Sequence, residues 1–372
     1  MNIVSPMDGS ELRAPAPIRV LVDLERMQPG SGHGGIKPGV YAFLGELARL
    51  GNPEGPRFTI SARGVSDLVR ELSGGVTLVA YDDLVDVIYS LFGYSPLLES
   101  GCPGVAVVVD VLHRQLPAAL PVEEVNLREQ QFQRLTQLPG IRLQCISAYT
   151  RDCLRRHFGV PADRCFVTAL PVHARFGTGD APAAVPAHEK RTFLYPANFW
   201  PHKNHEILLI AYRQYFRSSP DPWKLVLTGH EDARTRQVRA MARGLGIERS
   251  VSFPGHLDDQ AFARLWSRVG ALVFPSLHEG FAIPLLEAMQ FGVPIVASNA
   301  GAIPETAGDA ALLVDATSPA KLGQAMQTIA DDAGLRDDLV ARGRQRLALF
   351  SLAREVGTLA SHLEAAAREA HS

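Results

Sequence analysis

Short apolar runs alternate with amphipathic helical patterns along most of this chain, and the alternation restricts the fold more than any other feature. In the first half the apolar runs are "IRVLVDL" at 18–24, "VTLVAY" at 76–81, "GVAVVVD" at 104–110 and "LQCIS" at 143–147. Strands that are apolar throughout, with helices between them, are typical of a parallel sheet covered on both faces. The first half therefore predicts a doubly wound α/β domain.

A different composition interrupts the alternation at 173–191, "HARFGTGDAPAAVPAHEKR", where Gly, Pro and Ala dominate and no period is sustained. This segment predicts an interdomain linker. The alternation then restarts with the runs "RTFLYPAN", "KLVLTGH", "SVSFPGH", "ALVFPS", "PIVASNAG" and "AALLVD". We therefore expect two doubly wound Rossmann-like domains, at 1–180 and 190–350, that face each other across a cleft.

The last part of the chain, 351–372, carries one helical stripe made of Leu352, Val356, Leu359 and Leu363. An apolar stripe this late in the chain needs a surface to cover. The stripe predicts a helix that packs back across the domain junction onto the first domain.

Charge and cysteine content exclude several classes of protein. Lys and Arg number 37 and Asp and Glu 39, a net charge of −2, which disfavours a nucleic-acid partner. No apolar stretch reaches the ~20 residues that span a bilayer, so any contact with a membrane would be peripheral. The four cysteines (Cys102, Cys145, Cys153 and Cys165) show neither a C-x-x-C pair nor zinc spacing, and the first residues lack a secretory apolar block. A reduced, cytoplasmic protein is the expectation.

Neither standard nucleotide fingerprint is present. The loop "GSGHGGIKPG" does not fit G-x-G-x-x-G in register, and no G-x-x-x-x-G-K-[ST] occurs. These absences disfavour an NAD-dependent dehydrogenase and a P-loop enzyme.

The stretch "HEGFAIPLLEAM" at 278–289 follows an apolar strand and opens a helix, with Pro284 suited to the first helical turn. We expect the amides of Phe281, Ala282 and Ile283 to form an anion site at the positive helix end, as phosphate sites do. Gly280 allows a close approach there.

Two acids flank this predicted anion site, Glu279 before the helix and Glu287 within it. Carboxylates accept hydrogen bonds from vicinal hydroxyls, such as those of a ribose or a hexose. Taken singly, Glu279 also fits an exposed loop acid, and Glu287 fits an acid that merely favours the helix dipole. Two acids around a phosphate site together indicate a sugar nucleotide.

The stretch "PSLHEGFAIPLLEAMQFGVPIVASNAGAIPE" at 275–305 resembles the E-x7-E signature of the retaining glycosyltransferases of family 4, which have the GT-B fold. A second stretch, "FLYPANFWPHKNHEILLIAY" at 193–212, resembles the family's strand, loop and helix that carry a basic residue for the donor diphosphate, here Lys203. Where the family often has an arginine a few residues earlier, this chain has Ala197 and Asn198, and Asn198 supplies hydrogen bonds but no charge. Phe253 lies in a segment similar to the one that contacts the nucleotide base.

The resemblance extends more faintly to the first domain. The loop with Gly34 and Gly35 is similar to the family's loop that faces the donor phosphates and acceptor. Many relatives have a catalytic histidine at the end of a first-domain strand. In this chain Val109 stands at that position, followed by Asp110 and later by His113. The resemblance leaves open whether His113 or Asp110 takes the role.

The resemblance implies a retaining hexosyltransferase of bacterial polysaccharide or lipopolysaccharide assembly that needs no metal or cofactor. Glu279 would hold the transferred sugar, Glu287 the ribose, and Lys203 the leaving diphosphate. GDP-mannose is the favoured donor, with UDP-glucose and UDP-GlcNAc as alternatives, and a saccharide or lipid-linked oligosaccharide is the expected acceptor. The alternatives are another GT-B-like enzyme, an epimerase or a phosphorylase, and a catalytically silent binding protein.

One basic segment is ambiguous. The stretch "RDCLRRHFGVPADR" at 151–164 holds four arginines and no lysine. It fits a solvated helix face. It also fits contact with an acceptor phosphate, or a peripheral contact with anionic lipid at the cytoplasmic face of the inner membrane.

Overall fold

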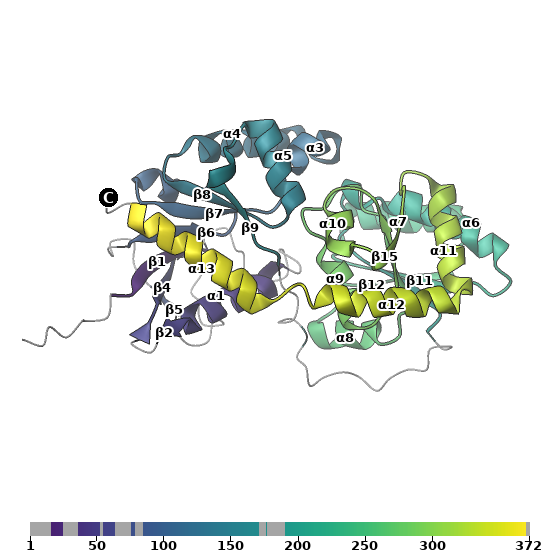
Figure 1. Ribbon diagram of the computed structural model, residues 1–372. Coiled ribbons are helices and arrows are strands. Elements are labelled where there is room, and N and C mark those ends of the chain that lie inside the picture. The colour runs from purple at the N-terminus through teal and green to yellow at the C-terminus, as the bar shows by residue number, and fades with distance from the viewer. Residues whose placement is uncertain are drawn as a thin grey trace, which may run out of the picture.

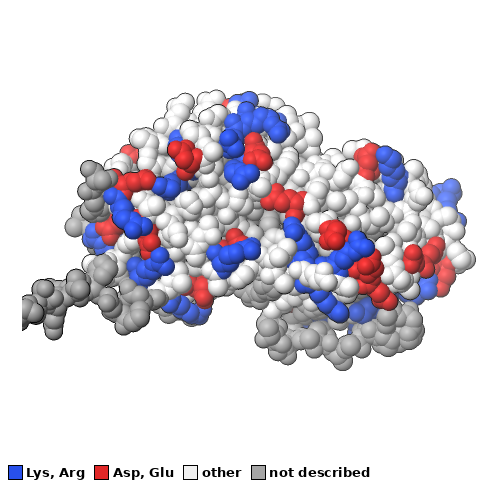
Figure 2. Space-filling view, in the orientation of Figure 1, with Lys and Arg blue, Asp and Glu red and all other residues white. Residues whose placement is uncertain are grey.

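The computed structural model describes residues 16–24, 36–52, 55–63, 76–78, 85–170, 176 and 190–369. Two α/β units lie side by side, each built on its own parallel sheet (Figure 1). The predicted fold class is confirmed. On the face shown in Figure 2 the outline is notched between the two lobes, and acidic and basic side chains are interspersed.

The first sheet has seven parallel strands in the order β5-β4-β1-β6-β7-β8-β9, and its middle strands β6 and β7 are buried along their whole length. Strands covered on both faces need apolar side chains on both, which explains the uniform apolar runs. A short antiparallel pair, β2 and β3, lies outside this sheet. The bounds are β1 Ile18–Asp23, β2 Gly51–Asn52, β3 Gly55–Pro56, β4 Phe58–Arg63, β5 Val76–Leu78, β6 Val87–Ser90, β7 Gly104–Val108, β8 Ile141–Cys145 and β9 Cys165–Val167.

The second sheet has six parallel strands in the order β12-β11-β10-β13-β14-β15. In each sheet the next strands in sequence lie on one side of the first strand, and the later strands lie on its other side. The strand order therefore reverses beside β1 in the first sheet and beside β10 in the second. Ligands of doubly wound sheets bind at that point, outside the carboxyl ends of the strands. The bounds are β10 Thr192–Pro196, β11 Lys224–Thr228, β12 Val251–Gly255, β13 Ala271–Phe274, β14 Ile295–Ser298 and β15 Ala311–Val314.

Helices cover both sheets, and several begin at a side chain that caps the free amides of the first turn. Ser147 caps α5 and Asp232 caps α7, where Thr235 completes a reciprocal capping box. The α-helices are α1 Ile36–Arg49, α3 Leu112–Gln115, α4 Val122–Gln137, α5 Ala148–Phe158, α6 His205–Ser218, α7 Ala233–Gly244, α8 Asp259–Trp266, α9 Ile283–Gln290, α10 Ile303–Ala307, α11 Pro319–Asp331, α12 Ala333–Leu347 and α13 Leu352–Glu369; the 3-10 turns are η2 Pro96–Ser100, η3 Pro117–Ala119, η4 Ala162–Arg164 and η6 Pro201–Lys203.

The last helix, α13, leaves the second unit and packs on the first (Figure 1). It contacts α1 and the strands β6, β7 and β8. Three residues of the predicted stripe, Val356, Leu359 and Leu363, are completely buried there, and the Glu355 carboxylate accepts from the Ala169 amide at 2.9 Å. The prediction that this helix crosses back to the first domain is confirmed.

Most of the predicted linker, 173–175 and 177–189, lies outside the described residues, as do Gly34 and Gly35. Phe176 is described, and its ring contacts Phe262 and Phe291 of the second unit at 6.0 and 5.1 Å. The chain has therefore reached the second unit by Phe176, while the domain boundaries at 180, 190 and 350 stay a prediction. In the part of the chain that the structure describes, no helix is both long and apolar enough to cross a membrane.

Candidate functional site

The two loops that carry Lys203 and Glu279 follow β10 and β13, which are neighbours in the second sheet at the point where the strand order reverses. The Leu277 amide donates to the His202 carbonyl at 2.8 Å, which joins the loops. Asn204, with φ of 62°, donates its side-chain amide to the carbonyls of Pro275 and Ala316 at 3.1 and 2.8 Å. Asparagine tolerates this left-handed backbone better than most residues. The loops are thus fixed to each other by bonds to backbone.

Lys203 and Glu279 form an ion pair, with Nζ 2.5 Å from Oε1 and each side chain 13% exposed. Beneath them, the Tyr195 hydroxyl donates to the Lys203 carbonyl at 2.8 Å and lies 2.9 Å from the Ser276 hydroxyl. Burial, with the nearby Glu279 charge, raises the pKa of Tyr195 well above its ordinary value, so the phenol stays neutral. The structure brings together two residues that are 76 positions apart in sequence.

Next to this pair lies the start of α9, whose N-cap residue Ala282 has φ of 77° and provides no side-chain cap. No described residue accepts a hydrogen bond from the amides of Phe281, Ala282 or Ile283. A non-glycine residue with positive φ costs about 1–3 kcal/mol and is common at functional sites. The side chains of Phe281 and Ala282 are buried, so only their backbone amides can serve the predicted anion site.

Glu287 lies within α9 and is 1% exposed. A buried carboxylate must be held by hydrogen bonds or by charge, because its transfer from water is otherwise very costly. The structure places it below the surface of the site, and its role toward a ribose stays a prediction.

The stretch around Gly280 touches the first unit directly. A Cβ on Gly280 would lie 1.8 Å from the carbonyl oxygen of Val109, at the carboxyl end of β7. The Thr150 hydroxyl of α5 donates to the Gly280 carbonyl at 3.3 Å. The glycine was expected to admit a ligand; in the structure the group that approaches it is the backbone of the other unit.

A second contact between the units uses Glu305. Its two carboxylate oxygens accept from the amides of Ala148 and Tyr149, each at 2.7 Å. These amides open α5, so the acid of one unit stabilises the positive end of a helix in the other. Together with Gly280, Glu305 fixes the two units in the arrangement that the structure shows.

Replacing Glu305 by alanine is expected to speed hydrogen exchange at the Ala148 and Tyr149 amides by about 10- to 100-fold. The reason is the loss of charge-assisted bonds worth ~1.5–3 kcal/mol. Glu305→Gln keeps one acceptor, so its exchange rates should lie between those of Glu305→Ala and the wild type. Exchange measured by NMR or mass spectrometry tests this, and unchanged rates at both amides would show that the contact does not hold the units together.

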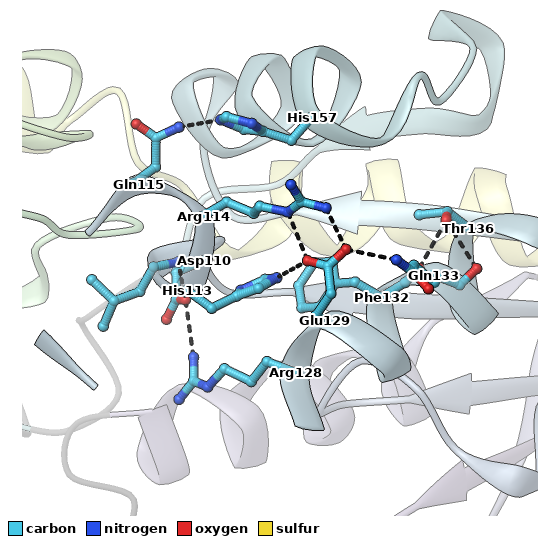
Figure 3. A network of polar contacts seen from close by, with 11 residues as sticks. Asp110, His113, Arg114, Gln115, Arg128, Glu129, Phe132, Gln133, Thr136 and His157 are labelled. Atoms are coloured by element: carbon cyan, nitrogen blue, oxygen red, sulfur yellow. Dashed lines mark hydrogen bonds and ion pairs between the residues drawn. The ribbon is translucent and has the colours of Figure 1, made fainter. Parts of the chain in front are cut away.

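The first unit contributes Asp110, just beyond β7 (Figure 3). Its carboxylate accepts from the Leu112 amide at 2.9 Å and from the Arg128 guanidinium at 3.2 Å. Burial lowers the pKa of His278 in the second unit, and the charge of Asp110 opposes that shift. Asp110 follows Val109, whose carbonyl oxygen faces Gly280, and so lies close to the loop that carries Glu279.

His113 points the other way, into the first unit (Figure 3). Its ring lies against Phe132 at 4.8 Å and Phe158 at 6.0 Å, and its Nε2 is 3.6 Å from the Glu129 carboxylate. Burial lowers the pKa of His113 to about 4, so its imidazole is neutral. Of the two residues left open by the sequence, Asp110 lies nearer the second unit, and the catalytic role of either stays a prediction.

Of the remaining predicted residues, Asn198 lies in the loop beyond β10 and Phe253 lies within β12. The Asn198 side-chain oxygen accepts from the His230 amide at 3.0 Å and so joins two loops. Phe253 is partly buried, with Phe199 stacked 6.2 Å away and the Arg239 guanidinium 5.1 Å above its ring. Within the described residues, no group of three or more side chains has the composition and geometry to hold a metal ion.

Sequence reasoning missed four residues that the structure places at this site: Trp200, His202 and His278 in the two loops, and Arg128 on α4. His202 and His278 directly precede Lys203 and Glu279, and Trp200 lies three positions before Lys203, so their closeness in sequence was a usable signal. Arg128 gave no signal, because only the fold brings α4 near the second unit.

Comparison with known proteins identifies similar sequences and folds. The family described as "Glycosyl transferases group 1" matches residues 180–346. The O-antigen chain mannosyltransferase B of Escherichia coli is 29% identical over 213 residues, 55% of this chain and 56% of that protein. The D-inositol 3-phosphate glycosyltransferase of Corynebacterium kroppenstedtii is 29% identical over 45% of this chain and 39% of its own length. The matches thus span about half, or less, of these relatives.

Solved structures share the whole architecture. Anabaena Alr3699/HepE, crystallised in complex with UDP and glucose, superposes with a TM-score of 0.69 over 94% of this chain and 100% of that chain, at 16% identity. At this identity the likeness concerns the fold. The two units and the returning helix form the predicted GT-B fold.

Proposed function

We propose that this chain, whose residues 180–346 match the glycosyl transferases of group 1, is a retaining glycosyltransferase. It would move a hexose from a nucleotide-diphosphate sugar to a saccharide acceptor. One observation carries the proposal: the Lys203–Glu279 pair lies beside the start of α9, where the amides of 281–283 have no described acceptor.

These groups have the chemistry that cleavage of a glycosyl diphosphate requires. Negative charge develops on the leaving diphosphate, and the α9 amides together with the Lys203 ammonium can stabilise it. The pair with Lys203 uses Oε1 of Glu279, so Oε2 remains to accept from hydroxyls of the transferred sugar.

Retention follows when the acceptor hydroxyl attacks the face that the diphosphate leaves. A leaving phosphate oxygen can then take the proton of the acceptor hydroxyl, and no protein nucleophile is needed. A glycosidase would instead require two carboxyl groups roughly 5–10 Å apart on either side of the scissile bond. Glu279 is paired with a lysine and Glu287 is buried within α9, which fits binding roles.

Among donors we propose GDP-mannose, because the E. coli relative is an O-antigen chain mannosyltransferase. The UDP and glucose of the Anabaena structure support UDP-glucose as the alternative. A saccharide or lipid-linked oligosaccharide of a bacterial surface polysaccharide would then accept the sugar.

A calorimetric or thermal-shift screen of GDP-, UDP-, ADP- and TDP-sugars tests the function and names the base. One nucleotide series should raise the melting temperature with its concentration, because a ligand that binds only the folded state stabilises it. Incubation with the donor alone then separates an epimerase, and phosphate dependence separates a phosphorylase. No stabilisation by any of the four would leave the proposal without a donor.

Replacing Glu287 by glutamine is expected to weaken nucleotide binding by about 10- to 100-fold, since a hydrogen bond to a charged acceptor contributes ~1.5–3 kcal/mol. Calorimetry with the nucleoside diphosphate identified by the screen measures the effect. The matched control is Glu355→Gln, because Glu355 on α13 is also a buried carboxylate, only 5% exposed. Equal affinity in both variants would remove Glu287 from the ribose site.

A further inference from the structure

Two buried histidines flank the Lys203–Glu279 pair, and each has one ring nitrogen without a hydrogen-bond partner among the described residues. His202 is 6% exposed and His278 4%. Within the described part of the chain nothing bonds to Nδ1 of His202 or to Nε2 of His278. A buried polar atom without a partner costs about 1–3 kcal/mol, so a ligand that supplies the missing bonds would be favoured.

Each of these two histidines contacts an aromatic ring, and the four rings, here named the Trp200–Tyr149 row, come from both units. Trp200 lies 5.7 Å from His202, and Tyr149 of α5 lies 5.8 Å from His278. Trp200 is 49% exposed, although its ring is large and apolar, and Lys203 Nζ is 5.9 Å from its centre. An exposed tryptophan beside buried polar groups is typical of a surface that binds a partly apolar, partly polar ligand.

Both imidazoles are neutral at ordinary pH. Burial is the main reason that the pKa of His202 falls to about 3, and Lys203 and His278 lower it further. Burial also lowers the pKa of His278, although Asp110 and Glu279 oppose the shift. A neutral imidazole offers one N–H donor and one lone pair. The one unpartnered nitrogen of each ring is therefore a donor in one tautomer and an acceptor in the other. A hydroxyl can pair with either form, whereas a phosphate pairs only with the donor.

Two other histidines have buried nitrogens without partners, yet they lie in protein cores. His205 is completely buried between Phe199 and Tyr195, with ring centres 4.5 and 4.9 Å away. His113 is packed inside the first unit, as described above. His202 and His278 differ because they lie in loops next to the candidate site and close to charged groups of both units.

We infer that His278 and His202 hydrogen-bond the ring hydroxyls of a hexopyranose that lies against the Trp200–Tyr149 row. The inference rests on the proposed function and adds the residues that recognise the sugar by hydrogen bonds. The hexopyranose is either the sugar of the donor or the first residue of the acceptor, because both present the same hydroxyl chemistry.

The test uses His278→Leu, which keeps an apolar side chain but removes the ring nitrogens, and His278→Gln, whose amide can replace Nε2. His202→Asn, whose amide can replace Nδ1, and His202→Leu form the second pair. His362→Gln is the control, because His362, on α13, stacks on Phe166 of β9, away from the site. Thermal unfolding shows which variants retain the fold.

Binding of methyl α-D-mannopyranoside and methyl α-D-glucopyranoside is followed by saturation-transfer NMR, with and without GDP or UDP. We expect each leucine variant to lose glycoside binding by about 10-fold or more, while the affinity for bare GDP or UDP changes less than about twofold. The glutamine and asparagine variants should recover most of the binding. A raised KM for the donor would assign the sugar to the donor, and a raised KM for the acceptor would assign it to the acceptor.

The inference is overturned if folded His278→Leu binds the glycosides as the wild type does, or if the wild type binds neither glycoside. It is equally overturned if the leucine variants lose nucleotide and glycoside affinity together, since that result indicates a structural role. Failure of the proposed function would look different, because the wild type would then bind no nucleotide sugar at all.

Discussion

Replacing Lys203 by alanine is expected to lower kcat for sugar transfer by about 100- to 1,000-fold. The Lys203 ammonium is placed to stabilise charge on the leaving diphosphate, and the loss of one such donor typically has an effect of this size. The variant also leaves the Glu279 carboxylate, 13% exposed, without its counter-charge. Glu279→Ala should be similarly inactive, because it removes the acceptor for the sugar hydroxyls.

Initial rates with the donor found by the screen measure this effect, and thermal unfolding separates lost chemistry from lost structure. Lys321→Ala is the matched control, since Lys321 also pairs with an acid, Asp315, at 3.3 Å but is 63% exposed. An exposed pair contributes little, so this control should keep wild-type rates. Wild-type rates in Lys203→Ala would exclude Lys203 from the mechanism.

Replacing Gly280 by alanine is the second change with a large expected effect. The new Cβ would lie 1.8 Å from the Val109 carbonyl oxygen, far inside van der Waals contact, and that carbonyl belongs to the backbone and cannot simply turn aside. The two units must then move apart. Misplacement of reacting groups by about 1 Å can cost 100-fold in rate, so we expect transfer to fall by at least that factor.

Small-angle scattering should show a larger radius of gyration for Gly280→Ala, while circular dichroism retains the signal of both sheets. The control is Gly357→Ala on α13, where an added Cβ meets nothing within 4 Å. Alanine is about 1 kcal/mol better than glycine inside a helix, so this control should be neutral or slightly more stable. Gly280→Ala with unchanged dimensions and rates would mean that the contact between the units is dispensable.

The architecture could be predicted from the sequence because the strands of parallel sheets are apolar throughout and easily recognised. The run at 18–24 became β1 and the run at 271–276 became β13, shorter by one or two residues. Strands β4, "FTISAR", and β6, "VIYS", were missed, since they mix polar with apolar residues or are very short.

The candidate site was predicted only in part, because sequence identifies residues but not their neighbours. Glu279 and Lys203 were named separately, and their direct pairing became visible only in the fold. Gly280 was interpreted as space for a ligand, whereas the nearest group is the Val109 backbone. His113 was kept as a candidate since a register shift of four residues cannot be judged from spacing, and its aromatic surroundings come from α4 and α5.

The returning helix α13 has a consequence for the order of events during synthesis. The strands of the first sheet are complete by Val167, but the helix that buries part of that sheet begins only at Leu352. At about 5–20 residues per second, the ribosome needs on the order of ten seconds or more to make the segment between them. During that interval the apolar patch destined for α13 is uncovered, so the half of the molecule that is translated first reaches its final form last.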